Sequence, residues 1–517
     1  MQTKEVALLA ILFLVAFAVY SIPLRSSAPF NQPLPYGEPD SAYHYALAGA
    51  IVSRDHVFGF TESLPSRFGF WHGVNGSTVS SAYPPSYHVG LASVEQFSSE
   101  TIVAYYTFAM LIAFIIIFPT YLLVRKLYGF LAGAVAGVGL IFANRNLLIF
   151  IFGQHPSILS FAFVPAVIYC VYRYADSLVQ KNEASIYAYL AALLLACQFI
   201  IHVQAFFTSV LFIIAFGLMI MIKERPLVNA KTLVLCFIVF AVLAIPILPS
   251  YSSAAGGHFD ASQIQLGRLL RWNIMPSEVV GNYPASYVNF SDNFGTWMLP
   301  FMLVTIIFLA LRRERADLAI IAWIIAVYAS IHLDLLGYTN YEIRTTARML
   351  LSESALFFSL VGISIVAIPG IFKVPAGVKA LLKYGLSAAV IALIAFFSAG
   401  AAINSASTAY PGVSRINPYQ LEAANWMRAN LPQDALVYDI GTITYSKVRW
   451  MLALSGREVA QAIDEITNAQ VMPTHVIIDS SDATLISRQD MLSQLNSVNV
   501  TGVKVYDKGY IRIYQAR

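Results

Sequence analysis

The chain has 517 residues, of which 58% are apolar and only 12% are charged, and its mean hydropathy is +0.66. Soluble domains are about 45–50% apolar and about 25% charged, so this composition excludes a soluble enzyme and a disordered protein, and a net charge of only +4 without a basic run excludes a nucleic-acid binder. The three cysteines, Cys170, Cys197 and Cys236, lie in apolar runs and form neither a disulfide framework nor a CxxC metal site.

Eleven apolar segments are predicted to cross a membrane, because a transmembrane helix needs about 20 apolar residues. The stretch 184–222 is divided near His202, since at about 1.5 Å per residue it is too long for one crossing. The first segment is interpreted as an uncleaved anchor, because ten further segments follow it. The predicted spans are 6–22, 102–124, 130–149, 157–175, 185–201, 203–222, 232–249, 297–311, 316–333, 347–368 and 384–402.

Lysines and arginines in short loops predict the orientation, because cytoplasmic loops are enriched in them. With the N-terminus inside, every even-numbered connection is basic, and an odd number of spans places the C-terminal tail outside. The predicted fold class is mainly α: a polytopic membrane protein of about eleven helices with a C-terminal soluble α/β domain. The predicted boundaries are 1–402 for the membrane domain, with long outer loops at 23–101 and 250–296, and 403–517 for the extracytoplasmic domain.

The first outer loop is about 80 residues long, and structureless loops beyond about 12–15 residues are uncommon and usually functional. Gly37 to Asp40 is predicted to form a turn, and Ser41 to Val52 to form a short helix at the membrane surface. Another helix is predicted to begin within Tyr83-Pro84-Pro85-Ser86-Tyr87-His88, near the end of the loop.

The segment Glu38-Pro39-Asp40-Ser41-Ala42-Tyr43-His44 carries the main candidates for chemistry. Its two carboxylates, Glu38 and Asp40, could hold a cation or orient an acceptor hydroxyl. Asp40 and His44 would share a helix face at i,i+4 spacing. The structural alternative is that Asp40, which stands before Ser-Ala-Tyr, caps the helix N-terminus and has no catalytic role.

Two arginines precede the tenth predicted span. Arg344 and Arg348 fall on one helix face near the outer boundary, and a guanidinium fork matches phosphate oxygens and stays charged in a low-dielectric setting. The alternative is that both side chains extend to the lipid headgroups, as any arginine near a span end can do.

After Pro411 the composition changes: residues 417–517 hold 9 basic and 10 acidic side chains. A helix is predicted over 417–430, and short buried strands over 435–439 and 475–479. The segments 503–506 and 510–514 flank Asp507-Lys508-Gly509, which predicts a hairpin. This α/β domain carries no phosphate loop, GxGxxG motif or catalytic-triad spacing, and is interpreted as a lid or an acceptor-docking domain.

These motifs resemble those of the membrane glycosyltransferases of the GT-C superfamily. The resemblance rests on Asp40 in the first outer loop, followed by Tyr43-His44 and a surface helix, and on the Tyr83-Pro84-Pro85 segment, which is similar to the Tyr-Pro-Pro segment of several GT-C branches. It implies transfer of a sugar from a polyprenyl-phosphate or polyprenyl-pyrophosphate carrier on the outer face, with inversion of the anomeric centre. The residues that it implies are catalytic Asp40, Glu38 and His44, and substrate-binding Tyr43, Tyr83, His88, His155, Arg344 and Arg348.

The oligosaccharyltransferase branch carries a second acidic motif, sometimes Asp-x-His, that binds a divalent metal. At that place this chain has Phe152-Gly153-Gln154-His155-Pro156, which keeps only the histidine, and the chain also lacks the Trp-Trp-Asp-Tyr-Gly signature of that branch. The resemblance therefore implies no certain cofactor. A divalent cation, Mg²⁺ or Mn²⁺, would have Asp40 and His155 as ligands, few for a hard cation that prefers about six oxygens.

The predicted function is that of an integral-membrane glycosyltransferase in the cell membrane, with its active site and C-terminal domain extracytoplasmic. The expected partners are a polyprenyl-phosphate-linked sugar, a lipid, glycan or protein acceptor, and membrane lipids, but no nucleic acid. The alternatives are a metal-dependent oligosaccharyltransferase-like enzyme, a transporter or flippase, and a non-catalytic scaffold. A transporter would carry ionisable residues near the midplane and often two repeated halves, neither of which is evident here.

Overall fold

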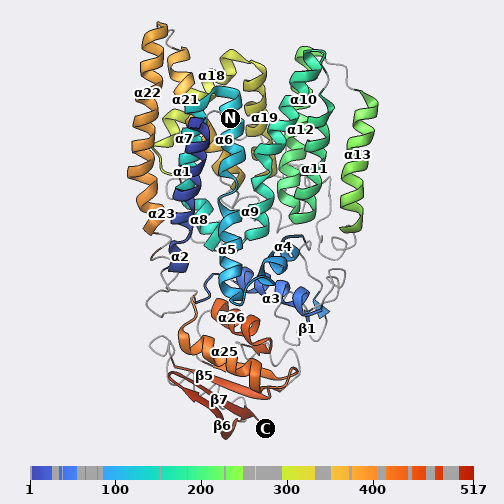
Figure 1. Cartoon of the computed structure of the whole chain (residues 1–517), viewed down its shortest axis with the longest axis vertical. Helices are drawn as coiled ribbons and strands as arrows, with labels where there is room; N and C mark the ends of the chain where they lie inside the picture. Colours follow the sequence, from blue (N-terminus) through green and yellow to red (C-terminus); the bar gives the residue numbers. More distant parts are fainter. Residues whose placement is uncertain are drawn as a thin grey trace. The chain divides into compact units, whose positions relative to one another are not determined.

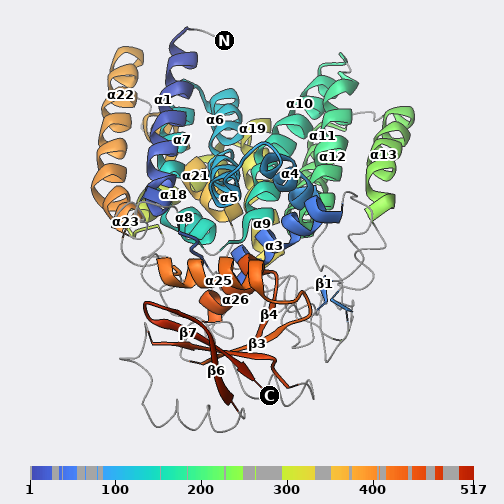
Figure 2. The same ribbon diagram turned by 60° about the horizontal axis from the view of Figure 1, so that its bottom comes forward.

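In the computed structural model, the contacts between residues divide the chain into two compact units (Figures 1 and 2). Unit 1 comprises Met1–Tyr20, Met110–Phe150 and His155–Ser405, and unit 2 comprises Ser21–Ala109, Ile151–Gln154 and Ala406–Arg517. The residues that the structure describes are 3–25, 34–37, 39–54, 64–65, 78–79, 86–151, 153–182, 184–225, 229–247, 262, 294–331, 351–371, 375–404, 407, 415–440, 445–460, 472–480 and 500–516.

Unit 1 is built from long apolar helices. Every predicted span overlaps a helix or an interrupted helix of the described chain. By length and hydropathy, six of the described helices could each cross a membrane, or seven if the bent pair α7–α8 is one span, so an exact number of eleven is not confirmed. The helices, several of which begin or end in unit 2, are α1 (Thr3–Tyr20), α5 (Thr101–Ala113), α6 (Ile117–Tyr128), α7 (Phe130–Ile141), α8 (Asn144–Ile151), α9 (His155–Ala162), α10 (Val164–Val179), α11 (Ser185–Ile201), α12 (Val203–Glu224), α13 (Ala230–Ala244), η3 (Ile245–Ile247), α18 (Met298–Arg312), α19 (Arg315–Ile331), α21 (Leu351–Ile371), α22 (Ala376–Leu393), η7 (Ile394–Ala399) and α23 (Gly400–Asn404).

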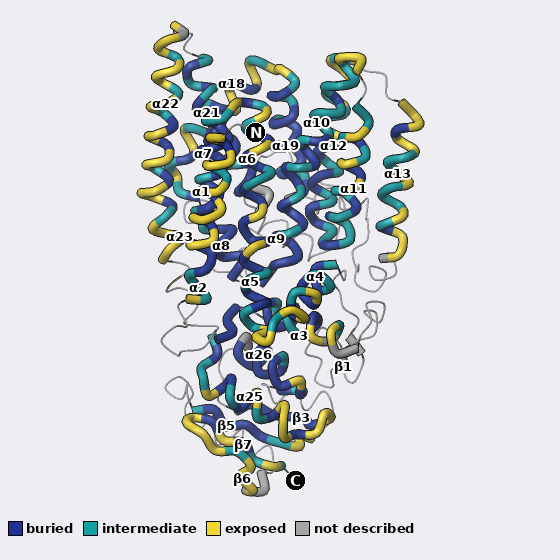
Figure 3. Tube along the Cα trace, in the orientation of Figure 1, coloured by how far each residue is buried: buried dark blue, intermediate teal, exposed yellow. Residues whose placement is uncertain are grey.

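The centre of unit 1 is the contact between α7 and α21, where small residues let two backbones approach closely. A Cβ at Gly139 of α7 would lie 2.1 Å from the Phe358 ring, and one at Gly362 of α21 would lie 2.4 Å from the Ala132 carbonyl oxygen. Helices in membranes associate through such small-residue contacts, because the hydrophobic effect does not drive apolar helices together in lipid. The outlying helices α13 and α22 show mostly exposed surface (Figure 3), including Phe237 and Leu381, as helices that face lipid tails would.

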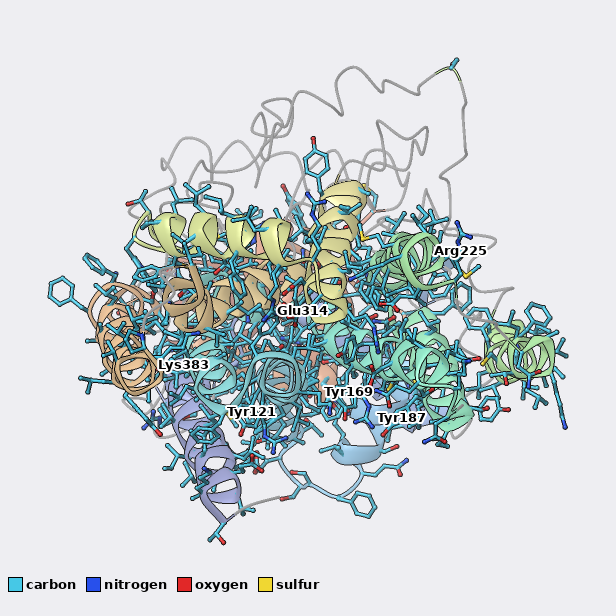
Figure 4. All side chains as sticks on the ribbon, turned by 90° about the horizontal axis from the view of Figure 1, so that it is seen from above. Tyr121, Tyr169, Tyr187, Arg225, Glu314 and Lys383 are labelled. Carbon is cyan, nitrogen blue, oxygen red and sulfur yellow. The ribbon has the colours of Figure 1, made fainter. Side chains whose placement is uncertain are left out.

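Ion pairs join the helix ends at one end of unit 1, the end at which Figure 4 labels Glu314. Arg315 at the start of α19 pairs with Asp176 of α10 and Glu224 of α12, and Arg312 forms a two-pronged pair with buried Asp317. The connections that meet here are those predicted to be cytoplasmic.

Three basic residues near this end have left-handed backbone conformations, which glycine normally adopts. Lys181, Arg225 and Arg313, which follow the ends of α10, α12 and α18, have φ values of 57°, 47° and 53°. A side chain in this region costs roughly 1–2 kcal/mol. Cations near a helix C-terminus are favoured by the helix dipole, which offsets part of that cost.

Unit 2 contains helices from the first long loop and a five-stranded sheet from the tail. Its helices are α2 (Ile22–Arg25), α3 (Pro39–Arg54), α4 (Ser86–Glu95), most of α5, α25 (Pro418–Asn430) and α26 (Tyr445–Ser455). The short strands β1 (Leu64–Pro65) and β2 (Thr78–Val79) pair with each other. The sheet contains β3 (Leu436–Ile440), β4 (Glu458–Ala460), β5 (His475–Asp479), β6 (Val500–Lys508) and β7 (Ile511–Ala516) in the order β4-β3-β5-β7-β6.

The predicted helix, strands and hairpin of the tail are present, whereas α26 and β4 were not predicted. Strands β4, β3 and β5 are parallel and β7 pairs antiparallel with both β5 and β6, and Figures 1 and 2 show α25 and α26 on the same side of the sheet. Asn417 and Gln420 form a capping box at the start of α25, and Gly509, with φ of +59°, turns the predicted hairpin. The α/β fold of this region is therefore confirmed.

The division of the chain at residue 402 stays a prediction. By contact, the residues of the first outer loop group with the tail rather than with the membrane helices. Helix α3 packs on α26, which lies some 400 residues further along the chain.

Candidate functional site around Asp40

Asp40 lies in the first turn of α3, which begins at Pro39. Proline suits the first helical position because its fixed φ matches the helix and its missing N–H is not needed there. Asp40 is therefore the second residue of the helix rather than its N-cap, and its catalytic role stays a prediction. Its side chain is half-buried, and the positive end of the helix dipole favours an ionised carboxylate here. Such a carboxylate can accept a proton or a hydrogen bond from a bound molecule.

Two glycine turns pack against Ser41, the residue after Asp40. Gly37 and Gly153 have φ values of +109° and +84°. A Cβ at Gly37 would lie 2.4 Å from the Ser41 Oγ, and a Cβ at Gly153 would lie 2.2 Å from the same oxygen and 2.5 Å from the Ser41 backbone nitrogen. Glycine alone fits both the backbone angle and the space. The turn at Gly153 thus lies against the start of α3, with no room for the acid that the oligosaccharyltransferase branch carries.

His44 and His88 come together between α3 and α4. The Nδ1 atom of His44 lies 2.9 Å from Nε2 of His88, both rings are fully buried, and the Tyr87 ring contacts His44 edge-on. A hydrogen bond between two imidazoles needs one N–H and one lone pair, so at least one ring is neutral. Tyr43 is buried beside His44. The sequence pattern marks each of these residues singly, and their catalytic and binding roles stay predictions.

Residues 34–37, which precede helix α3, are held by Tyr106 of α5 and by Arg415 and Ile416 of the tail. The Tyr36 and Tyr106 rings stack with centroids 4.2 Å apart, and the Tyr106 hydroxyl accepts from the Tyr36 N–H at 2.7 Å and donates to the Tyr36 carbonyl oxygen. The guanidinium of Arg415 lies over the Tyr36 ring, and the Ile416 N–H donates to the Pro35 carbonyl oxygen at 3.2 Å. The sequence analysis gave no reason to select these residues.

Trp450 of α26 makes a further contact with the same segment. Its indole Nε1–H donates to the Gly37 carbonyl oxygen at 3.3 Å, and its ring packs against Tyr45 of α3 and Tyr105 of α5. The Tyr105 hydroxyl donates to the Ser41 carbonyl oxygen at 3.0 Å. Three hydrogen-bonding aromatic side chains, Tyr105, Tyr106 and Trp450, therefore hold the backbone on both sides of Asp40.

Glu95, the last residue of α4, is a buried acid that the sequence analysis did not select. It is 6% exposed, and its Oε1 has no hydrogen-bond partner among the described residues. Burial raises the pKa of this carboxyl to about 8. Burial, and to a smaller extent the charge of Glu95, also raise the pKa of Tyr87. Near neutral pH, Glu95 is therefore mainly a neutral carboxylic acid.

The predicted metal pair, Asp40 and His155, is divided between the two units, and its metal site stays a prediction. His155 begins α9 and is buried, with its Nε2 3.0 Å from the Phe150 carbonyl oxygen. That nitrogen is therefore an N–H donor and cannot ligate a metal. Among the described residues, no group of three or more His, Cys, Asp or Glu side chains could hold a metal ion. Within the described part of the chain, Asp40 and His155 would therefore be few ligands for a divalent cation, which prefers about six oxygens.

Four of the predicted site residues, Glu38, Tyr83, Arg344 and Arg348, lie outside the described residues. The second long outer loop, 250–296, also lies outside them except for Ser262 and residues 294–296.

A family model described as a family of unknown function (DUF6541) matches residues 2–338. No curated protein sequence matches the chain.

Several solved structures are similar over most of the chain. The oligosaccharyltransferase of Archaeoglobus fulgidus in its apo form is 15% identical, with a TM-score of 0.59, over 91% of this chain and 69% of that chain. The same organism's AglB, in complex with an inhibitory peptide and a dolichol-phosphate, is 14% identical with a TM-score of 0.60, over 92% of this chain and 70% of that chain. ArnT from Cupriavidus metallidurans, bound to undecaprenyl phosphate, is 11% identical with a TM-score of 0.59, over 99% of this chain and 98% of that chain. These likenesses establish the fold, and at the level of the fold they agree with the predicted resemblance.

Proposed function

We propose that this chain, which belongs to the family of unknown function DUF6541, is an integral-membrane glycosyltransferase. In this proposal it transfers a sugar from a polyprenyl-phosphate carrier to a lipid, glycan or protein acceptor. The observation that carries the proposal is the likeness to ArnT, which covers 99% of this chain and 98% of that one. ArnT was solved with undecaprenyl phosphate and AglB with a dolichol-phosphate, and both ligands are polyprenyl phosphates.

Asp40 is the proposed general base. The acceptor hydroxyl gives its proton to the Asp40 carboxylate while its oxygen attacks the anomeric carbon of the donor. The bond from that carbon to the phosphate oxygen breaks, and the polyprenyl phosphate leaves with the electron pair. Attack from the face opposite the phosphate inverts the anomeric centre. General base catalysis of this kind typically contributes about 10²–10⁴-fold to the rate.

Arg344 and Arg348 are the proposed partners of the donor phosphate. A guanidinium offers two parallel N–H donors to phosphate oxygens and keeps its charge near lipid. The departing phosphate gains negative charge as the bond breaks, so fixed cations beside it would stabilise the transition state more than the ground state. His44 and Tyr43 are proposed to support the placement of α3, since both are buried.

The site is proposed to lie on the extracytoplasmic face. The support is the unbroken alternation of basic connections, which places the loop that carries Asp40 outside. Single cysteines at Ser253 and at Ala230, in a chain whose own three cysteines are replaced, test this orientation in intact cells. A membrane-impermeant thiol reagent should label only the first, and labelling of only the second would reverse the topology.

A peptide acceptor is the second candidate, and the likeness to AglB favours it. The Gly153 turn weighs against it, because the acid of the metal-binding motif has no space there. Donor turnover that requires a peptide carrying an Asn-x-Ser/Thr sequon would favour the oligosaccharyltransferase-like reaction. Turnover with a lipid or glycan acceptor alone would favour the first candidate.

The deciding experiment uses purified protein in lipid nanodiscs with a set of polyprenyl-phosphate sugars. Wild-type protein should consume one donor and release the free polyprenyl phosphate. Asp40→Asn should lower kcat by about two orders of magnitude or more, while Asp434→Asn, at an exposed position of the same unit, should have no effect. If all donors remain intact, a transporter or scaffold becomes the better hypothesis. Full turnover by Asp40→Asn would remove Asp40 from the chemistry.

A further inference from the structure

The backbone before Asp40 is the feature from which we draw a further inference. The segment 34–41 contains two residues, Gly37 and Ser41, whose carbonyl oxygens accept hydrogen bonds from Trp450 and Tyr105. Its described residues before Pro39, 34–37, form no helix or strand. Its conformation is therefore determined mainly by the groups that contact it.

Those groups come from distant parts of the sequence. Tyr105 and Tyr106 belong to α5, the turn at Gly153 lies between α8 and α9, and Trp450 belongs to α26. Trp450 and Gly37 are 413 residues apart in the chain. Trp450 is fully buried, and its single polar atom is directed at the Gly37 carbonyl oxygen. An indole in this position fixes both the distance and the direction of that carbonyl.

We propose that Trp450, through its hydrogen bond to Gly37, is a positioning residue that holds the start of α3 and thereby sets the direction of the Asp40 carboxylate. The inference rests on the proposed function and extends it. It gives the C-terminal domain a part in building the catalytic turn, in addition to the lid or acceptor-docking role expected from its sequence. Trp450 itself touches no substrate in this proposal.

The test separates the hydrogen bond from the bulk of the ring. Trp450→Phe keeps an aromatic ring but removes the N–H donor together with part of the side-chain volume, so a control must match the lost volume. We expect kcat to fall about three- to tenfold, as for the loss of one neutral hydrogen bond, while KM for the donor changes less than twofold. A general loss of folded enzyme would lower the amount of active protein without this selective change in kcat.

The matched control is Trp323→Phe. Trp323 of α19 is also fully buried, and its Nε1 has no hydrogen-bond partner among the described residues, so the substitution removes a similar volume and no such bond. Its kcat per folded molecule should equal that of wild type. Tyr105→Phe removes the hydrogen bond to Ser41 from the α5 side and should reproduce the effect of Trp450→Phe. An unchanged kcat in both Trp450→Phe and Tyr105→Phe would overturn the proposal.

A second readout does not depend on turnover. In a chain with Ala in place of Cys170, Cys197 and Cys236, the thiol of an Asp40→Cys variant would lie in the first turn of α3, where the helix N-terminus lowers a thiol pKa. The pH dependence of its alkylation reports its position at that terminus. Adding Trp450→Phe should move the midpoint of alkylation to higher pH, and adding Trp323→Phe should not. If wild type has no transferase activity, this readout alone decides: an unmoved midpoint would overturn the role of Trp450.

Discussion

Gly153→Ala is the substitution whose effect the structure defines most sharply. The new Cβ would lie 2.2, 2.5 and 2.8 Å from Oγ, N and Cα of Ser41. Two of these atoms belong to the backbone at the start of α3, so a side-chain rotation cannot relieve the overlap. The positive φ of +84° costs roughly 1–2 kcal/mol for any residue with a Cβ. Overpacking adds about 1–3 kcal/mol. The total loss of stability is then about 2–5 kcal/mol.

The functional effect follows from the displacement. Ordinary contact would require Ser41 to move by about 1 Å, and a misplacement of that size can lower a rate by about 10²-fold. Gly456→Ala is the control, because Gly456 has a φ of +62° in the same unit and nothing within 4 Å of the new Cβ. It should lose only about 1–2 kcal/mol and keep its kcat. Thermal unfolding and donor turnover measure the two quantities. If Gly153→Ala behaves like Gly456→Ala, the packing of the turn against α3 has been misassigned.

Three further predictions concern other groups. Arg348→Lys keeps the charge but loses the planar fork, so KM for the lipid donor should rise; an unchanged KM in this variant and in Arg344→Ala would exclude a phosphate site there. Burial raises the pKa of Glu95 to about 8, so folding favours its protonated form, and its carboxyl increasingly destabilises the fold as pH rises from about 4.5 to 8. The stability of Glu95→Gln relative to wild type should therefore increase across that window. A difference in Tm that does not change with pH would contradict the assignment. Treatment with EDTA should leave donor turnover within twofold, whereas a loss that Mg²⁺ or Mn²⁺ restores would show that ligands come from residues such as Glu38.

The elements that the sequence predicts correctly have strong local signals. The capping box of Asn417 and Gln420 and the turn before Tyr510 mark a helix and a hairpin at their ends, and both elements are present. Helix α3 was predicted over 41–52 and extends over 39–54, because Pro39 occupies its first position. Strand β4 has only three residues, too few to show a periodicity, and it was missed.

The contacts of the site could not be read from the chain in the same way. His44 and His88 were both selected, but no pattern indicates that their rings meet, since 44 residues separate them. The Gly37 carbonyl oxygen accepts a hydrogen bond from Trp450. A single tryptophan in a helix with both polar and apolar residues is more often a core residue than a hydrogen-bond donor to a distant part of the chain. Local sequence specifies where a helix starts, whereas the identity of the group that holds it depends on the tertiary fold.

The composition of unit 2 has a consequence for the order in which the protein is made. Its first segment ends at Ala109 and its last begins at Ala406, so about 300 residues are synthesised in between. At about 5–20 residues per second, roughly 15–60 s pass before the ribosome completes the partner of the Asp40 turn. During that interval the first loop lacks Trp450 and Arg415, and of the contacts described above only those from Tyr105, Tyr106 and the Gly153 turn can form. The contact of Trp450 with Gly37 therefore forms late in synthesis, and under the proposed function a chain that stops before α26 should have a lower kcat.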